Sequence, residues 1–144
     1  MTATHTSLPE LQTAFYGVLV PSGSLYSGLA SLGVTGVFDA GGVPENTLFP
    51  YITLFADSRE GPDNVFGTRG YNATIQVDIW SIYQGWNECY NILNVVSNLL
   101  DQQILSLSTH HHVYTLYQMG HPMFDPADER IRHLSVSYKT FTQE

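Results

Sequence analysis

The chain has 144 residues and a mass of 16.0 kDa; 43% of its residues are apolar and only 12% are charged. This length suits one domain with its own core, and the apolar fraction excludes a disordered chain. Five Lys and Arg against thirteen Asp and Glu give a net charge of −8, which argues against sequence-independent binding of nucleic acid and against docking on an anionic membrane.

The single cysteine, Cys89, cannot form an internal disulfide and is expected to be a buried structural thiol. Residues 1–10 lack the basic and apolar regions of a secretory signal. No apolar run approaches the ~20 residues that cross a bilayer. We therefore expect a soluble protein made in a cytoplasm.

Residues 7–36 predict an N-terminal helix followed by a Gly/Ser-rich segment. Over residues 7–20, Ser7 can act as the N-cap, Glu10 lies at the capping-box position, and apolar residues follow at spacings of three and four. Residues 24–36 are rich in small side chains and predict either a second short helix or an ordered loop.

The middle of the chain carries the clearest strand signals. Residues 37–39 and 49–55 are expected to be extended, and residues 71–83 alternate apolar and polar side chains, with one face on a core. Residues 57–70 are polar and rich in turn residues, so they form a long hairpin arm or a mobile loop. Residues 86–100 have apolar side chains at helical spacing, which is typical of a core helix lying on a sheet.

Two more strands are predicted near the C-terminus, over residues 113–119 and 131–141, with a turn at 125–129 between them. The order of helices and strands predicts an α+β fold over residues 1–144 as a single domain. Its mainly antiparallel β-sheet would have the helices packed on one face.

Two clusters are candidates for chemistry. Of three consecutive histidines on a strand, only His110 and His112 point to the same side, and a solvated turn before a strand is the simpler interpretation. Asp125, Asp128 and Glu129 form a carboxylate cluster, but their spacing is also typical of a turn. A metal-dependent enzyme that uses these histidines and aspartates is thus one alternative, although no nucleophile elbow or phosphate-binding loop accompanies them. The nine tyrosines suit either protein–protein contacts or half-buried positions in a sheet.

Several short motifs stand in a recognisable order before, within and after the alternating strand. They are Val37-Phe38-Asp39, Pro44, Phe49-Pro50-Tyr51-Ile52-Thr53-Leu54, Asp78-Ile79-Trp80-Ser81, Gly85, Leu99-Leu100 and Asp125-Pro126-Ala127-Asp128-Glu129-Arg130-Ile131-Arg132-His133.

In this order, over residues 37–141, the motifs resemble the tail-completion (tail-terminator) proteins of long-tailed bacteriophages and phage-derived particles. The resemblance implies a virion structural protein, not an enzyme, that needs no cofactor or metal. It implies a homo-hexameric ring at the head-proximal end of the tail tube, which stops polymerisation of the tube and joins the tail to the head. The alternative within the virion is another ring-forming component of the neck or the tail tube.

The resemblance also implies the partners and a location. The partners are further copies of the chain, the tail tube protein and a neck or head-completion protein, with DNA passing through the lumen without specific binding. Assembly would take place in the cytoplasm of a bacterial host. By analogy, we expect the polar arm at 57–70 to contribute the assembly interface, through Asp57, Arg59, Asp63, Asn64, Phe66 and Arg69.

Overall fold

A computed structural model describes residues 7–57, 63–65 and 68–143 of the chain. Its elements follow the predicted alternation of helices and strands. In chain order they are α1 (Leu8–Leu19), the 3-10 turn η1 (Pro21–Gly23), α2 (Ser27–Ala30), β1 (Val37–Asp39), β2 (Tyr51–Asp57), β3 (Asp63–Val65), β4 (Thr68–Ser81), α3 (Asn87–Leu100), β5 (His111–Phe124) and β6 (Arg132–Gln143).

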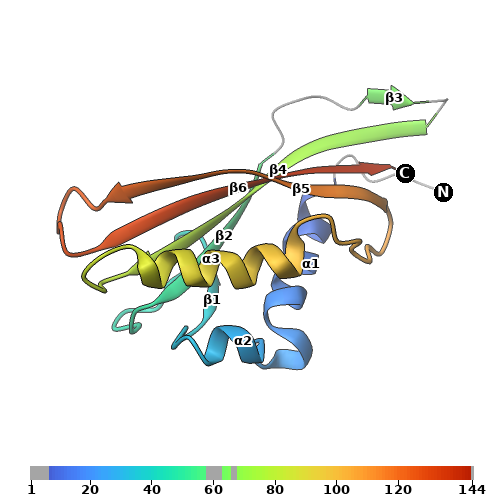
Figure 1. Cartoon of the computed structure of the whole chain (residues 1–144). Helices are drawn as coiled ribbons and strands as arrows, with labels where there is room; N and C mark the ends of the chain where they lie inside the picture. Colours follow the sequence, from blue (N-terminus) through green and yellow to red (C-terminus); the bar gives the residue numbers. More distant parts are fainter. Residues whose placement is uncertain (1–6, 58–62, 66–67, 144) are drawn as a thin grey trace.

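The strands form one mixed sheet in the order β1-β2-β4-β6-β5, and β3 pairs with the beginning of β4. β1 runs parallel to β2, whereas the other pairings are antiparallel. Figure 1 shows α1, α2 and α3 on the same side of the sheet, so within the described residues the other face carries no helix. The expected fold class is therefore confirmed: one α+β domain with a mainly antiparallel sheet and helices on one face.

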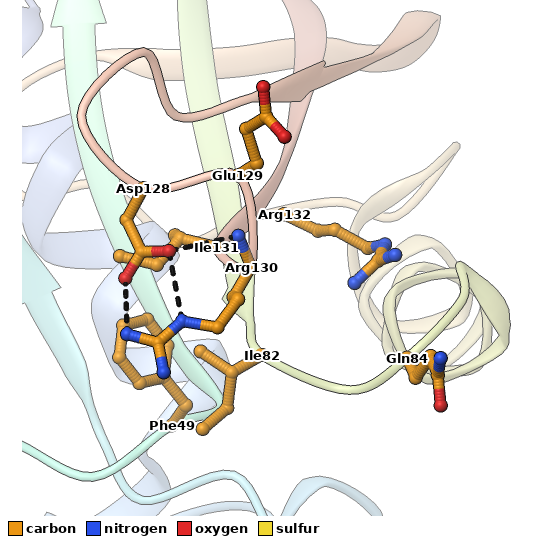
Figure 2. Close-up of a pocket in the computed structure, with 8 residues that line it drawn as sticks. All are labelled: Phe49, Ile82, Gln84, Asp128, Glu129, Arg130, Ile131 and Arg132. Carbon is orange, nitrogen blue, oxygen red and sulfur yellow. Dashed lines mark hydrogen bonds and ion pairs between the residues drawn. The ribbon is translucent and has the colours of Figure 1, made fainter.

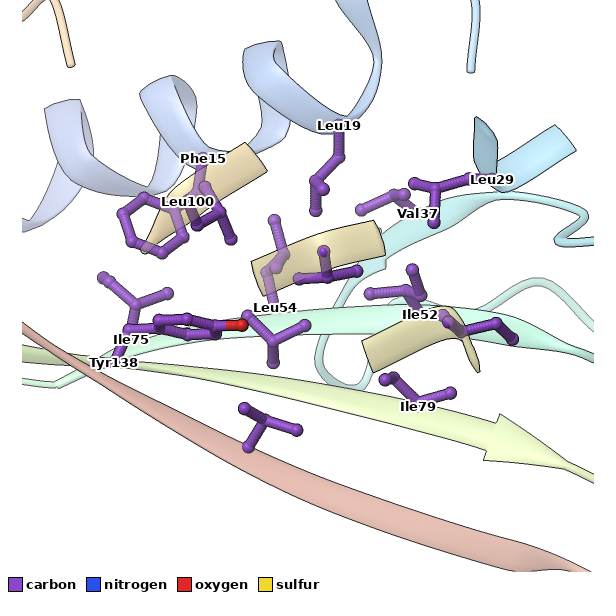
Figure 3. Close-up of a cluster of buried hydrophobic side chains, with 14 of the residues drawn as sticks. Phe15, Leu19, Leu29, Val37, Ile52, Leu54, Ile75, Ile79, Leu100 and Tyr138 are labelled. Carbon is purple, nitrogen blue, oxygen red and sulfur yellow. The ribbon is translucent and has the colours of Figure 1, made fainter. Parts of the chain in front are cut away.

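Strict alternation along the central strands creates the core. On β4, Ile75, Val77 and Ile79 are fully buried, and Figure 3 shows Phe15 of α1 and Leu100 of α3 on the side of the core where Ile75 and Tyr138 lie. Each buried large side chain of this kind contributes about 1.5–3 kcal/mol of transfer free energy to folding. The buried face of α3 comprises Cys89, Ile92, Val96 and Leu100.

Cys89 is fully buried, as predicted, and burial raises the pKa of its thiol to about 11. The thiol is therefore neutral at physiological pH and behaves as a small apolar side chain. None of the helices in the described part of the chain is long and apolar enough to cross a membrane.

The hydrogen bonds at the start of α1 differ from those predicted. Ser7 lies at the N-cap position but makes no capping hydrogen bond with its side chain; instead, its hydroxyl oxygen accepts a 2.7 Å hydrogen bond from the hydroxyl of Thr142 on β6. Glu10 lies in the first turn, but its carboxylate binds the segment that precedes β5. The undecided segment 24–36 contains the short helix α2, followed by a loop into β1.

β5 is twice as long as the predicted strand at 113–119, with 14 residues. His110 and His112 are buried at its beginning, so the prediction of a solvated turn is wrong for these two residues. Two register shifts against β6, at 112/114 and 117/119, interrupt the alternation of the side chains. Because the alternation is interrupted, the sequence pattern does not indicate where this strand begins and ends.

Candidate assembly surfaces

The polar segment 57–70 has the form of a hairpin arm over the residues that the structure describes. β3 pairs antiparallel with the first residues of β4, with Asp63 opposite Gly70 and Asn64 opposite Arg69. Figure 1 shows this hairpin extending from the sheet at the end opposite the β5–β6 turn. A two-stranded hairpin is at best marginally stable by itself in water, so an extended one is suited to packing against a partner.

The residues predicted for the assembly interface lie on this arm as far as they are described. Asp57 ends β2, where it is half-buried, and Arg69 is exposed on β4. The structure brings the two strands of the arm together through main-chain pairing. Of the full set, Asp57 is on β2, Asp63 and Asn64 are on β3, Arg69 is on β4, and Arg59 and Phe66 lie outside the described residues.

A row of rings crosses three strands on the helix-free face of the sheet. Trp80 of β4 stacks on His133 of β6, with ring centroids 3.9 Å apart and planes inclined by 10°, and Tyr51 of β2 lies 6.1 Å from Trp80. Trp80 Nε1 donates a 3.1 Å hydrogen bond to Thr53 Oγ1. His133 Nε2 lies 3.1 Å from Oδ1 of Asp78. These contacts bring the three rings together into one polar and aromatic surface.

Sequence reasoning did not find this row. The register pairs Tyr51 with Trp80 and Trp80 with His133, although His133 is more than fifty positions from Trp80 in the chain. The signal in the sequence that could have indicated the row is Trp80, an aromatic side chain at a position of β4 where the alternation predicts a polar one. Its partners depend on strand register, which the sequence pattern alone does not specify.

A cavity of about 570 Å³ opens beside the β5–β6 turn, at the end of the molecule opposite the arm. Phe49, Ile82 and Ile131 give it an apolar lining, and Figure 2 shows Arg130 turned toward Asp128 at its edge. Arg130 donates from Nη2 to Asp128 Oδ2 at 2.8 Å and from Nε to Oδ1 at 3.0 Å. These hydrogen bonds lower the pKa of Asp128 to about 2, so this carboxylate is ionised at neutral pH.

The carboxylate cluster at 125–129 is a turn, as the simpler interpretation predicted. Asp125 Oδ1 accepts a 2.8 Å hydrogen bond from the backbone N–H of Ala127, and Asp128 Oδ1 accepts one of 3.0 Å from that of Arg130. Both side chains therefore satisfy local backbone donors.

The two buried histidines bind groups within the chain. The His110 side chain is 1% exposed, and its Nδ1 lies 3.0 Å from Glu10 Oε2. His112 Nδ1 accepts a 3.2 Å hydrogen bond from the backbone N–H of Leu105, which places the ring proton on Nε2, 2.6 Å from Thr115 Oγ1. Burial lowers the pKa of His112, which favours this neutral form. These contacts fix the segment before β5 onto α1 and the sheet.

The histidines and the aspartates lie at opposite ends of β5. His112 is near the beginning of this strand and Asp125 follows its end, so roughly 40 Å separates them at ~3.3 Å per residue. The two pairs cannot share a metal ion. Within the described residues, no group of three or more His, Cys, Asp or Glu side chains is placed to hold one.

The fold and its surfaces define a class of protein: a small α+β domain with an extended arm, a sheet face without a helix over the described residues, and an open cavity. A family model described as tail completion protein gp17 matches residues 24–143. The chain belongs to this family. It is thus a structural component of a virion, a tail completion protein rather than an enzyme.

Among the solved structures that share the fold are two that cover nearly the whole chain. A chain from the virion of a native gene transfer agent (GTA) particle superposes with a TM-score of 0.83 at 18% identity, covering 98% of this chain and 100% of that one. A second solved chain has a TM-score of 0.61 at 15% identity, covering 94% of both chains. At these identities the likeness shows a common fold alone. No curated protein sequence matches this chain.

Proposed function

We propose that this protein caps the head-proximal end of a phage-like tail tube, stops growth of the tube and joins the tail to the neck of the head. The observation that carries the proposal is the family match over residues 24–143, which includes the arm, the whole sheet and the β5–β6 turn. The shared fold with a chain of a gene transfer agent virion supports it.

In this proposal, residues 1–144 act as one tail-terminator-like domain, and six copies close into a ring. A closed ring requires each copy to contribute two different surfaces, one to each neighbour. The tail tube protein binds one side of the ring and a neck or head-completion protein binds the other. DNA passes through the lumen without specific binding, which the net charge of −8 favours. Assembly takes place in the cytoplasm of the bacterial host.

The arm is the proposed assembly element, through Asp57, Arg59, Asp63, Asn64, Phe66 and Arg69. Its support is the extension of the β3–β4 hairpin from the end of the sheet. β3 has only three residues, all of which pair with β4, and so short a hairpin has little packing of its own. A partner surface would supply the packing that it lacks.

The test is to shorten the arm without disturbing the sheet. Replacing residues 64–68 by Gly-Gly leaves Asp63 and Gly70 able to close a short hairpin loop. We expect the variant to keep the far-UV circular dichroism and melting temperature of the wild type, because the core lies elsewhere. We expect it to lose binding to isolated tail tubes.

A matched control carries Glu45→Gly and Asn46→Gly in an exposed turn between β1 and β2. Asn46 already has a φ of 64°, so glycine fits there without strain. This control should bind tubes like the wild type. Infectious tails completed by the arm variant would contradict the role of the arm. Unlimited self-polymerisation of the wild type would instead favour the alternative, a tube component.

A further inference from the structure

The cavity beside the β5–β6 turn contains a cation that no described carboxylate neutralises. Arg132 of β6 lines this cavity, and its guanidinium lies 5.9 Å from the centroid of the Trp86 ring and 5.7 Å from that of Phe124. Its Nη1 donates a 2.7 Å hydrogen bond to the carbonyl oxygen of Tyr83. Its Nε is buried and has no hydrogen-bond partner among the described residues. A partly desolvated cation of this kind gains from a carboxylate that a partner brings to it.

The other charged side chains of the cavity leave a second group without a partner. Asp128 and Arg130 neutralise each other through two hydrogen bonds, at 2.8 and 3.0 Å. Glu129 is exposed, and its carboxylate makes no hydrogen bond or ion pair with a described residue. Figure 2 shows this carboxylate turned away from the guanidinium of Arg132. Over the described residues, the cavity therefore presents an unpaired cation and an unpaired carboxylate beside its apolar lining.

The tip of the arm, residues 63–69, carries groups that complement the cavity. β3 ends at Val65 and β4 begins at Thr68, and the sequence places Phe66 in the short stretch between them. Asp63 stands two positions before Val65 in the sequence, and Arg69 is exposed on β4. The tip thus supplies two apolar side chains, a carboxylate and a guanidinium. These are the groups that would cover an apolar lining and neutralise one cation and one carboxylate.

The arm is too far from the cavity of its own chain to bind there. Figure 1 shows the two at opposite ends of the sheet. β4 runs from the arm toward the cavity over 14 residues, which corresponds to roughly 40 Å at ~3.3 Å per residue. The identical cavity of a neighbouring copy has no such restriction. A contact between the arm of one copy and the cavity of the next joins two different surfaces, as a closed ring requires.

We propose that the arm of one copy inserts into the cavity of the next copy in the ring. The apolar side chains of the tip cover the apolar lining, and Asp63 binds Arg132 of the neighbouring copy. Arg69 binds the neighbouring copy's Glu129. This inference rests on the proposed function and names the surface that receives the arm. The four charged side chains that line the cavity sum to zero, so it is not suited to the phosphate backbone of a nucleic acid.

The first test reverses the charges of the pair formed by Arg69 and Glu129, because both side chains are exposed and neither belongs to the core. Arg69→Glu and Glu129→Arg each place like charges together at every contact of the ring. We expect each single variant to raise at least tenfold the protein concentration that caps half of the tail tubes. The double variant should return this concentration to within threefold of the wild-type value.

Arg69→Glu combined with Glu45→Arg is the matched control. It has the same net charge as the double variant, but Glu45 is an exposed residue that does not line the cavity. We expect this control to remain as weak as Arg69→Glu alone. Single variants that cap tubes like the wild type, a double variant that stays weak, or equal restoration by the control would each overturn the proposal.

The second test identifies the contact in whole particles. The photo-crosslinking residue p-benzoylphenylalanine replaces Phe66 in cells that assemble the particles, and mass spectrometry locates the crosslinks. We expect a product of two copies in which residue 66 is joined to a peptide from residues 127–132. The same replacement at Phe55, which is 50% exposed on β2, is the control and should not give this product.

Other crosslinks from residue 66 would contradict the inference. A product with the tube protein, with the neck protein or with a different surface of the chain would overturn it, as would particles that contain the variant and give no product. If the wild type forms no ring on tubes, the proposed function itself fails. That result differs from complete rings in which residue 66 does not reach the cavity of the next copy.

Discussion

Removing the carboxylate of Glu10 should destabilise the fold by about 3 kcal/mol. Glu10 lies in the first turn of α1, yet its carboxylate accepts hydrogen bonds from a segment almost one hundred positions away. The backbone N–H of Thr109 donates at 2.8 Å and the hydroxyl of Ser108 at 3.0 Å, and the Thr109 hydroxyl also donates. His110 contributes its backbone N–H at 3.3 Å and its ring Nδ1 at 3.0 Å.

The size of this loss in unfolding free energy depends on which of the donors water can solvate once the carboxylate is removed. Ser108 and Thr109 are exposed and can be solvated, whereas the ring of His110 is 1% exposed. A buried polar group that loses its partner costs about 1–3 kcal/mol, and the backbone N–H of His110 loses such a partner, whereas the ring Nδ1 also lies 3.0 Å from Thr109 Oγ1. Loss of an acidic residue from the first turn adds about 0.3–1 kcal/mol. Glu10→Ala should therefore cost about 3 kcal/mol, and Glu10→Gln, which keeps one acceptor oxygen, about half as much.

Urea unfolding of Glu10→Ala, followed by far-UV circular dichroism, measures this change. Glu45→Ala is the control, because it removes the same charge from a residue that is exposed in a turn. The free energy of unfolding of this variant should stay within about 0.5 kcal/mol of that of the wild type. The effect should also depend on pH. Burial alone would raise the pKa of Glu10, but the hydrogen bonds from Thr109, His110 and Ser108 outweigh it and lower the pKa below 4.5. The contribution is thus present above pH 4.5 and lost as pH falls through the lowered value. Equal stabilities of the Glu10→Ala and Glu45→Ala variants would refute the reasoning.

Two further predictions concern buried polar groups. Burial lowers the pKa of His112 below its usual 6.5, so as pH drops below 6.5 the unfolded chain takes up a proton before the folded chain does, and the free energy of unfolding should fall. His112→Asn, whose side chain can still accept the hydrogen bond from Leu105, should reduce this pH dependence in urea titrations at pH 5–7. The same pH dependence in the variant as in the wild type would contradict the prediction. The hydroxyl of the fully buried Tyr138 lies 2.7 Å from Ser97 Oγ, and burial raises its pKa to about 12. Tyr138→Phe should therefore lower the free energy of unfolding by about 1–2 kcal/mol, and a neutral result would show that water replaces the bond.

Local patterns were sufficient to predict much of the fold. The alternation of Tyr71, Ala73, Ile75, Val77 and Ile79 predicted the central strand and its buried face, because side chains in a strand alternate and one face of this sheet lies on the core. The helices at 8–19 and 87–100 were predicted close to their observed bounds for the same kind of reason, with apolar residues at helical spacing.

The failures have in common that a distant partner decided the outcome. Glu10 was expected to cap its own helix, but its carboxylate instead accepts hydrogen bonds from Thr109 and contacts the ring of His110. The bulges of β5 broke the period-two pattern, so the strand was predicted at half its length. The stack of Trp80 on His133 depends on strand register, which no local pattern specifies. The arm was predicted from its local turn residues, whereas the row of rings, which depends on strand register, was not.

The central claim is that this chain ends the tail tube. The most direct measurement mixes the purified protein with isolated tail tubes and records negative-stain images together with the mass of the bound protein. We expect one ring of six copies on a single end of each tube, and tubes capped in this way should no longer elongate when tube protein is added. Copies bound along the tube wall, or capped tubes that continue to grow, would contradict the account.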